Sequence, residues 1–398
     1  MTIKHQVLLA NLALGLLLLT SLAVQAHAEE ASSWGTAARN PPKFAADRIF
    51  VKFKTTGLGA QAVGAARARS VRLSKGVTVE SAVKAYQGRS DVEWAEPDFA
   101  LTPDDVTPND PNFNNQWGLP NIMAHLAWNI TTGSSNVTVC TIDSGIDYNH
   151  PDLKPNLHPA TGTSFIDNGN LMDGLGHGTH VAGIIGASGN NSLMVSGVNW
   201  KVKLLACRFM DASGVGYTGA ASNCVDYCVR MGAKVISGSF SGDYYSQQLR
   251  DAINAAGNKG VLYVASAGNK KRNLDTNPVY PAALNLPNQL TVAASFWSMS
   301  NWRPELSSYS NYSPSKVHIA APGDNILSTK LGGGTVTMGG TSMATPFVSG
   351  SAALLLSVAP QLTPAQLKDL LMSTVRTSPA FTGKVVSVSC QGGRWARG

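Results

Sequence analysis

The sequence predicts an α/β protein whose mainly parallel sheet is covered by helices on both faces. From residue 116 onward, short apolar runs alternate with longer helical patterns, which is typical of strand–helix–strand units. The runs are apolar nearly throughout, as expected of strands that are buried on both faces. Apolar residues make up 43% of the 398 positions and charged residues 14%, so the chain can bury a sizeable core in one large domain and a smaller one.

The elements of the large domain follow in order along the chain. The expected strands span residues 136–142, 201–207, 233–240, 260–267, 290–295 and 317–320, and the expected helices span 177–187, 218–231, 245–259, 342–358 and 364–373. In such sheets, functional side chains collect at the carboxyl ends of the strands. Asp143, Ser239 and Asn269 all stand at or just beyond those ends.

A smaller unit precedes this domain, over residues 47–101. Residues 48–54 alternate polar and apolar like a half-buried strand, 81–87 suggest a short helix, and 92–99 read as an edge strand broken by Pro97. Residues 102–115 are rich in Pro, Asp and Asn and predict a linker. An ordinary accessory domain is one interpretation of this unit.

Residues 1–28 have the pattern of a secretory signal peptide. Lys4 and His5 precede the apolar run 7–19, and Ala26-His27-Ala28 gives a small-x-small cleavage site. A membrane anchor is the alternative, but the run is short for a spanning helix. We therefore expect a secreted protein with no membrane span once the signal is removed.

The distribution of charge and the cysteines bear on whether the protein binds nucleic acid or zinc and whether it forms disulfides. The net charge of +7 is spread along the chain without a basic stripe, so nucleic acid is not an expected partner. Cys140 and Cys207 lie in apolar strand-like runs and are expected to be buried free thiols. Cys224 and Cys228 stand four apart on a predicted helix without the further ligands that zinc needs. With Cys390 the count is odd, so at least one thiol is free or pairs between molecules.

Four residues in small-residue settings form a catalytic constellation. Asp143 ends a strand and can orient an imidazole, and His177 stands between glycines as an accessible general base. Asn269 follows another strand and can donate to an oxyanion. Ser342 lies in Gly339-Gly340-Thr341-Ser342 just before an apolar helix, whose N-terminus favours developing negative charge.

Two other readings of these residues are weaker. His177 and His180 could bind a metal, but no Glu stands between them and no third ligand follows in a helical motif. A lipase or esterase of the α/β-hydrolase type would need Gly-x-Ser-x-Gly and the order Ser, Asp, His, and the sequence has neither.

The order Asp, His, Ser is that of subtilisin. Asp143-Ser144-Gly145, the segment from His177 to Gly183, and the segment from Gly340 to Pro346 resemble the three active-site motifs of the subtilisin-like serine proteases. The resemblance covers about residues 112–375. It implies a three-layer α/β/α domain with a mainly parallel seven-stranded sheet, and a serine endopeptidase in which Asp143, His177 and Ser342 are catalytic and Asn269 donates to the oxyanion. The alternative is a catalytically inactive relative that acts as a binding or scaffold protein.

The same resemblance assigns substrate-binding segments. Gly214, Val215 and Gly216 would pair with a substrate backbone on one side, and Ser239, Phe240 and Ser241 on the other. Ser266, Ala267 and Gly268 complete the set. Main-chain hydrogen bonds to an extended peptide suit broad specificity for protein and peptide substrates. Ser241 stands where the family commonly has Gly, so its hydroxymethyl group is expected to narrow the pocket.

The resemblance also implies a domain organisation and a structural Ca²⁺. Residues 29–108 resemble a propeptide that assists folding and inhibits its own enzyme, with the domain proper at 47–101, and residues 109–380 form the catalytic domain. Autocleavage is expected between Phe99 and Asn112. Ca²⁺ suits a set of hard oxygen ligands, namely Gln116, Asp152, Gly189, Asn191, Leu193 and Val195. No catalytic cofactor is implied, and the enzyme is expected to be a monomer.

Two segments depart from the family pattern. Lys270-Lys271-Arg272 directly follows Asn269, where the family often has an acidic or neutral residue. We hypothesise that this cationic cluster favours acidic or uncharged P1 side chains. Residues 381–398 form an atypical tail that looks truncated, and we expect its end to be poorly packed.

Overall fold

The computed structural model describes residues 44–54, 68–99, 106–167, 169–301 and 303–386. The chain divides into two compact units, the first ending at residue 104 and the second beginning at 105. This boundary lies four residues before the one expected from the sequence. The expected signal peptide, residues 1–28, lies outside the described residues.

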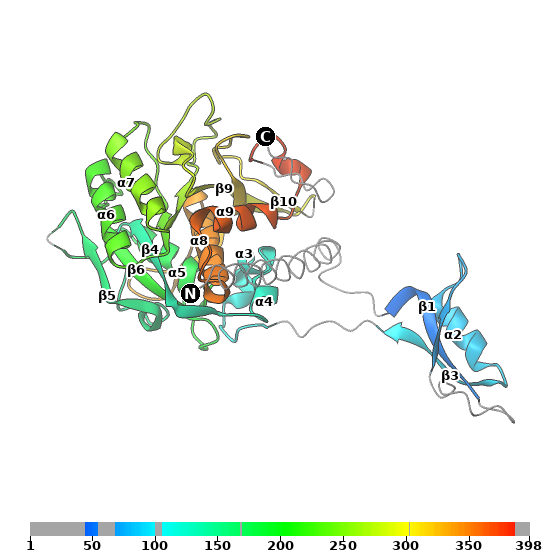
Figure 1. Ribbon diagram of the computed structural model, residues 1–398. Coiled ribbons are helices and arrows are strands. Elements are labelled where there is room, and N and C mark those ends of the chain that lie inside the picture. Colours follow the sequence, from blue (N-terminus) through cyan, green and yellow to red (C-terminus); the bar gives the residue numbers. More distant parts are fainter. Residues whose placement is uncertain (1–43, 55–67, 100–105, 168, 302, 387–398) are drawn as a thin grey trace, which may run out of the picture. The chain divides into compact units, whose positions relative to one another are not determined.

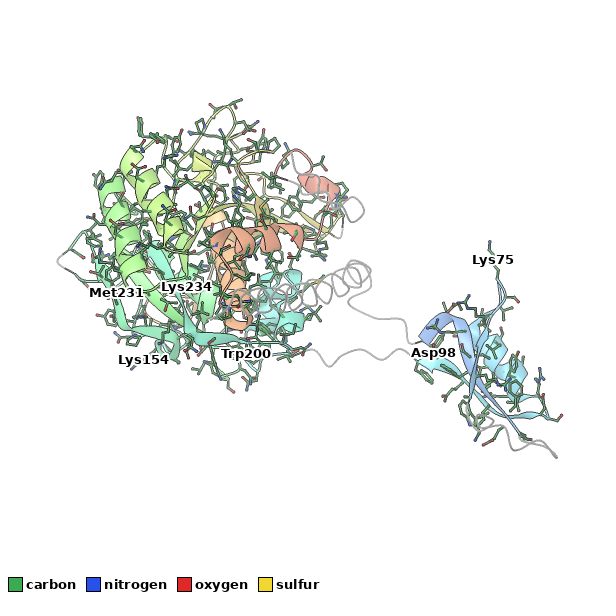
Figure 2. The ribbon with its side chains drawn as sticks, in the orientation of Figure 1. Lys75, Asp98, Lys154, Trp200, Met231 and Lys234 are labelled. Atoms are coloured by element: carbon green, nitrogen blue, oxygen red, sulfur yellow. A yellow bond between two sulfur atoms is a disulfide. The ribbon has the colours of Figure 1, made fainter. Side chains whose placement is uncertain are left out.

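The first unit is a three-stranded antiparallel sheet with one helix. Strands β1 (Phe44–Phe53), β2 (Arg69–Arg72) and β3 (Val92–Phe99) take the order β2-β1-β3, and helix α2 (Val79–Gln87) contacts β1 and β3. The expected break at Pro97 is wrong, because β3 continues to Phe99. A proline is tolerated there since β3 is an edge strand that pairs on one side only. Asp98 of this strand, labelled in Figure 2, accepts from the Arg48 guanidinium of β1 at 2.6 Å.

An eight-stranded sheet forms the centre of the second unit. Its order is β10-β9-β8-β7-β4-β6-β5, with β11 also paired to β9. Seven of these strands run parallel, and β10 alone is antiparallel, along the end of β9. The strand bounds are β4 (Gly133–Asp143), β5 (Leu157–Ser164), β6 (Lys201–Arg208), β7 (Val235–Gly238), β8 (Leu262–Ser266), β9 (Gln289–Ser298), β10 (Arg303–Leu306) and β11 (Ile319–Pro322). The resemblance implied seven strands, which is the number of parallel strands here, but β5 and β10 lie outside the six strand ranges expected from the sequence pattern.

Helices cover both faces of this sheet, giving the three expected layers (Figure 1). Helices α6 (Thr218–Arg230) and α7 (Gln247–Asn258) cover one face, and α5 (His177–Gly186), α8 (Thr341–Val358) and α9 (Pro364–Ser373) cover the other. Alternate residues of each strand enter opposite cores. Val139 and Leu204 enter the core that contains α5 and α8, while Cys140 and Leu205 enter the core that contains α6 and α7. Near-continuous apolar strands are therefore required by the two-sided burial.

Shorter elements complete the second unit. They are η1 (Phe113–Asn115), α3 (Gly118–Asn121), α4 (Ala124–Ala127), η2 (Lys154–Asn156), η3 (Ala282–Leu284), the hairpin β12 (Ile326–Thr329) and β13 (Thr335–Met338), and η4 (Pro379–Phe381). Trp200, labelled in Figure 2, stands just before β6 and packs its ring 5.0 Å from that of Trp128. This contact connects the end of α4 to the segment before β6, an inner strand of the sheet.

The cysteines correct the expectation of buried free thiols. Disulfides join Cys140 to Cys228 and Cys207 to Cys224, so that α6 is linked covalently to β4 and β6. Cys140 is in register with Leu205 and Cys207 with Ile142, which puts both strand cysteines on the same face of the sheet. Cys224 and Cys228 are one turn apart and meet them from α6. Cys390 lies outside the described residues.

The chain from Phe381 to Val386 packs against the rest of the second unit. Val385 is buried in a cluster with Val317, and the Val386 N–H donates to the Val317 carbonyl at 2.6 Å. The end of the atypical tail, 387–398, lies outside the described residues. Among the described helices, Thr341–Val358 is long and apolar enough to cross a membrane, but most of it is buried in the core.

Candidate active site

Asp143 and His177 meet at the carboxyl edge of the sheet. Asp143 is the last residue of β4 and is 1% exposed, and His177 is the first residue of α5 with its side chain 22% exposed. The His177 Nδ1 lies 2.7 Å from the Asp143 Oδ1, which also accepts the Ser144 N–H at 2.7 Å. A carboxylate on Nδ1 fixes the proton there, so Nε2 is left as the basic nitrogen.

Gly178 lets these two segments approach each other. A Cβ on Gly178 would lie 2.1 Å from the Gly145 carbonyl oxygen and 3.1 Å from the Asp143 Cβ. No side chain fits at that distance, so the His-Gly pair in the sequence is a steric requirement of the Asp–His contact.

Two opposing effects set the pKa of His177. Burial lowers it, but the negative charge and hydrogen bond of Asp143, together with the charge of Asp173, raise it above the usual value for histidine. His180 differs. Its Nε2 donates to the carbonyls of Ile326 and Val336 at 3.0 and 3.1 Å, and burial lowers its pKa to about 4. His180 is therefore a neutral residue that binds the hairpin β12–β13.

Ser342 is the second residue of α8, and Pro346 follows it by four. The proline has no N–H to donate to the Ser342 carbonyl, as a regular helix would require. Ser239 supplies the missing donor, because its hydroxyl donates to that carbonyl at 2.9 Å. In return, the Ser342 hydroxyl donates to the Ser239 carbonyl at 3.1 Å. The end of β7 and the start of α8 are thus joined by a reciprocal pair of hydrogen bonds.

That pair sets the hydroxyl conformation of Ser342. Within the described residues, the hydroxyl bonds to Ser239 and has no hydrogen bond to His177. Nucleophile–base hydrogen bonds are often long or misaligned without substrate and tighten in the complex. The arrangement therefore resembles a resting site.

Asn269 and the start of α8 form a site for an oxyanion. The Asn269 Oδ1 accepts the Thr341 N–H and hydroxyl, both at 2.9 Å, which directs Nδ2 the other way. A Cβ on Gly340 would lie 3.3 Å from this Nδ2 and 3.6 Å from the Ser342 nitrogen. Both donors therefore lie close to the position that a side chain at residue 340 would occupy, and the φ of 150° at Gly340 also disfavours any side chain there. The N-terminus of α8 adds its dipole.

Thr341 and Asn311 position the loop that carries Asn269, and the sequence analysis did not identify either residue in this role. The Thr341 hydroxyl accepts the Gly268 N–H at 3.0 Å while it donates to Asn269. Asn311 is buried and uses both ends of its amide, since Nδ2 donates to the Ala267 carbonyl and Oδ1 accepts the N–H groups of Lys270 and Arg272. Only the fold brings Asn311 here, because it is 42 residues from Asn269.

The three substrate segments expected from the sequence differ in what they can offer. Residues 214–216 form a turn with a single bridge between Gly216 and Met210, and Val215 is exposed. Residues 239–241 continue β7, and Gly242 exchanges two backbone bonds with Tyr280, each 2.8 Å long. Ser266 belongs to β8.

Ala267 and Gly268 have less to offer a substrate backbone. Their backbone N–H and carbonyl groups already bond to Val292, Thr341 and Asn311. Each of these groups already has a partner among the described residues, so the two residues are better suited to shaping a pocket than to pairing with a peptide. The Ser241 Oγ lies 3.2 Å from the place of a Gly268 Cβ, so its side chain fills the gap between these two segments.

The cationic cluster after Asn269 has an acidic partner. The Asp243 carboxylate lies 2.5 Å from the Arg272 guanidinium and 3.5 Å from the Lys270 ammonium. The guanidinium beside Asp243 lowers the pKa of that carboxyl, so it stays charged. The positive charge of the cluster is therefore partly offset.

The residues expected to bind Ca²⁺ lie around one loop. Asp152 is buried, and its carboxylate accepts the Asn191 side-chain N–H at 2.9 Å and the Val195 N–H at 3.1 Å. Gln116 faces the same loop but exchanges two 2.8 Å bonds with the Ser196 backbone. Gly189 and Leu193 lie in the same loop, residues 189–195.

Asp110 is a further carboxylate at this loop that the sequence did not suggest. It is 4% exposed, its Oδ2 accepts the Asn190 N–H at 2.6 Å, and its Oδ1 has no partner in the described structure. Burial and the charge of Asp152 raise the pKa of Asp110. A buried carboxylate oxygen without a donor is suited to a cation.

The comparisons with known proteins agree with this geometry. A sequence model described as "Subtilase family" matches residues 134–388. Thermitase of Thermoactinomyces vulgaris is 42% identical over 253 residues, which cover 63% of this chain and 86% of Thermitase. The "Thermophilic serine proteinase" of Bacillus sp. (strain AK1) is 38% identical over 281 residues, which cover 70% of this chain and 67% of that proteinase. "Subtilisin-like protease 1" of Plasmodium berghei is 36% identical over 313 residues, and the chain spans only about half, 52%, of that relative.

A solved structure is also similar. It is described as a cold adapted subtilisin-like serine proteinase, with a TM-score of 0.55 and 31% identity, and the match covers 73% of this chain and 95% of that one. The family match, the relatives and the three-layer fold lead to one conclusion: the chain belongs to the subtilase family of serine endopeptidases.

Proposed function

We propose that this protein is a secreted serine endopeptidase, made as a zymogen, that hydrolyses peptide bonds through Ser342. The observation that carries the proposal is that two donors without a partner among the described residues, Asn269 Nδ2 and Ser342 N–H, lie near Gly340 at the nucleophile. Strand register links this loop to the Asp143–His177 pair, because Ser342 bonds to Ser239, and Ser239 and Asp143 directly follow the paired residues Gly238 and Ile142 of β7 and β4. Each part is ordinary alone, but a hydroxyl, a base with an orienting acid and an oxyanion site together define acyl transfer.

The chemistry follows from these positions. The Ser342 Oγ attacks the peptide carbonyl carbon and its proton passes to the His177 Nε2, while Asp143 stabilises the imidazolium. The carbonyl oxygen becomes an oxyanion that accepts from Asn269 and Ser342. His177 then donates the proton to the leaving amine, and the acyl-enzyme forms. Water, deprotonated by His177, attacks the acyl carbon and releases the acid, which returns Ser342 to its hydroxyl form.

Labelling with a fluorophosphonate tests this function. We expect stoichiometric modification of the wild type at Ser342, none in Ser342→Ala, and strongly slowed labelling in His177→Ala. A fully folded wild type that neither reacts nor cleaves casein would favour the alternative, an inactive binding or scaffold protein.

The first unit is proposed to be the inhibitory propeptide, removed by self-cleavage. Residues 109–112 already belong to the second unit, because the Asn109 side chain accepts the Ser192 N–H at 2.8 Å and the Asn112 N–H donates to Met194 at 2.9 Å. Cleavage between Phe99 and residue 108 would leave these bonds intact, which narrows the expected window. Ser342→Ala should then retain residues 47–101, and mass spectrometry of secreted wild type should find the new N-terminus in this window. A processed Ser342→Ala protein would assign maturation to another protease.

We also propose that the loop of residues 189–195 holds a structural Ca²⁺. Asp110 and Asp152 would supply the negative charge, and carbonyl and amide oxygens the remaining ligands. Chelation should lower the melting temperature of the wild type, and Asp110→Asn should remove most of that difference. An equal loss of stability on chelation in both proteins would place Ca²⁺ elsewhere.

The P1 preference follows from charge at the cluster of residues 270–272. We propose a preference for acidic or uncharged P1 residues within an otherwise broad specificity, weakened in the wild type by Asp243. Asp243→Asn should raise kcat/KM for Glu at P1 relative to Leu, and Asp251→Asn, an exposed charge on α7, is the matched control. A clear wild-type preference for basic P1 residues would contradict the proposal. The monomeric state stays a prediction.

A further inference from the structure

Asp173 is a buried carboxylate that the reaction outlined above does not use. It lies in the loop before α5, is 3% exposed and accepts five hydrogen bonds. Its Oδ1 accepts the N–H groups of Leu175 and Gly176 at 2.9 and 2.8 Å. Its Oδ2 accepts the N–H and hydroxyl of Thr179 at 2.8 and 2.6 Å. These bonds hold the backbone on both sides of His177.

The fifth bond links this loop to the strand of Asp143. The Ser144 hydroxyl donates to the Asp173 Oδ1 at 2.8 Å and accepts the Gly178 N–H at 3.0 Å. Ser144 follows Asp143 directly, and Gly178 follows His177 directly. The Ser144 hydroxyl therefore joins the residue after Asp143 to the residue after His177. This connection holds the two segments at the distance at which the Asp143 and His177 side chains meet.

All five groups that face Asp173 are donors, so only an ionised carboxylate satisfies them together. Burial raises the pKa of Asp173, but the hydrogen bonds from Thr179, Leu175 and Gly176 outweigh it and hold the pKa below the usual value. The negative charge is thus permanent at working pH. It is also one of the charges that act on His177.

We propose that Asp173, with Ser144 as its bridge, is a positioning residue of the catalytic centre that fixes the His177 imidazole against Asp143 and keeps a second negative charge beside it. The role as positioning residue rests on the proposed function of His177 as general base. Asp173 does not touch the reacting atoms. Its effect passes through the backbone at residues 175–179 and through the electric field at the imidazole.

The groups that face His177 are few in the described part of the chain. Asp143 on β4 bonds to it, Asp173 lies in the preceding loop, and His180 on α5 is neutral because its pKa is lowered. Arg208 on β6 approaches Gly174 of the loop but is paired with Asp167 at 2.7 Å. Removing the charge of Asp173 should therefore lower the pKa of His177, since Asp173 is one of the groups that raise it.

Kinetics on the full chain tests the positioning role. Ser144→Ala removes the bridge, and we expect kcat to fall by roughly 10- to 100-fold with little change in KM, because small displacements of a catalytic group cost rates of this order. Ser144→Thr keeps the hydroxyl and should retain most activity. Asp275→Asn is the matched control, since Asp275 also accepts serine hydroxyls but, in the part of the chain that the structure describes, bonds to none of the residues that flank His177.

A proton NMR titration of His177 in the Ser342→Ala protein tests the charge independently of activity. Adding Asp173→Asn should move the midpoint of the Nδ1 proton to lower pH, and the acid limb of kcat/KM should move likewise in the active enzyme. A purely structural role would leave both unchanged. Ser144→Ala with wild-type kcat, or Asp173→Asn with an unmoved midpoint, overturns the inference. Failure of the proposed function can be distinguished from failure of this inference. It would appear as a wild type that a fluorophosphonate does not label, whereas the NMR titration would still report the effect of Asp173 on His177.

Discussion

The reciprocal bonds between Ser239 and Ser342 give a prediction whose size follows from the structure. Pro346 leaves the Ser342 carbonyl without its helical donor, and the Ser239 hydroxyl replaces it at 2.9 Å. Ser239 is buried and its bond to the Ser342 carbonyl is part-buried, so Ser239→Ala leaves a carbonyl with limited access to water unpaired. An unpaired buried acceptor costs about 1–3 kcal/mol of the free energy of unfolding. We expect Ser239→Ala to lower the free energy of unfolding by an amount in that range.

A double-mutant cycle tests the cause. Pro346→Ala restores an N–H that can reach the Ser342 carbonyl in a regular helix. The double variant Ser239→Ala, Pro346→Ala should therefore lose less than the sum of the single losses, by about 1 kcal/mol or more. Urea unfolding followed by tryptophan fluorescence in the Ser342→Ala background avoids self-digestion and keeps the carbonyl in place. Additive losses, or a loss below about 0.5 kcal/mol for Ser239→Ala alone, would refute the reasoning.

Three further predictions concern the oxyanion site, the disulfides and the general base. Gly340→Ala should lower kcat by about 100-fold or more, as expected when an oxyanion donor is lost, with folding checked by circular dichroism; unchanged kcat would mean that the oxyanion forms elsewhere. Cys224→Ser should lower the free energy of unfolding by about 3 kcal/mol, since it opens a loop of sequence separation 17, and non-reducing peptide mapping of the wild type should find Cys207 joined to Cys224. The proposed mechanism needs neutral His177, whose pKa is raised, so it predicts that kcat/KM falls as pH drops through a midpoint above the ordinary histidine value; a midpoint below that value would contradict the described Asp143 contact.

Local patterns in the sequence were sufficient for the outline of the fold. The helix expected at 364–373 has these bounds in the structure, and the strand expected at 201–207 ends one residue later. Such elements are fixed by periodicity and by end signals, as with Thr363, which caps α9 together with Gln366. Strands β5 and β10 were missed, because short, partly exposed strands that contain a proline, at residue 159 in β5 and 304 in β10, give little periodic signal.

The sequence by itself predicted the family and the chemistry proposed for it, because Asp143, His177 and Ser342 each stand in a short motif of small residues that is recognisable locally. Tertiary structure decided everything that depends on separate segments meeting. Examples are the pairing of four cysteines across α6 and the sheet, the use of Asn311 to hold the Asn269 loop, and the burial of Asp110 and Asp173. These contacts join residues that are often tens of positions apart, and their partners are specified only by the register and packing of the sheet.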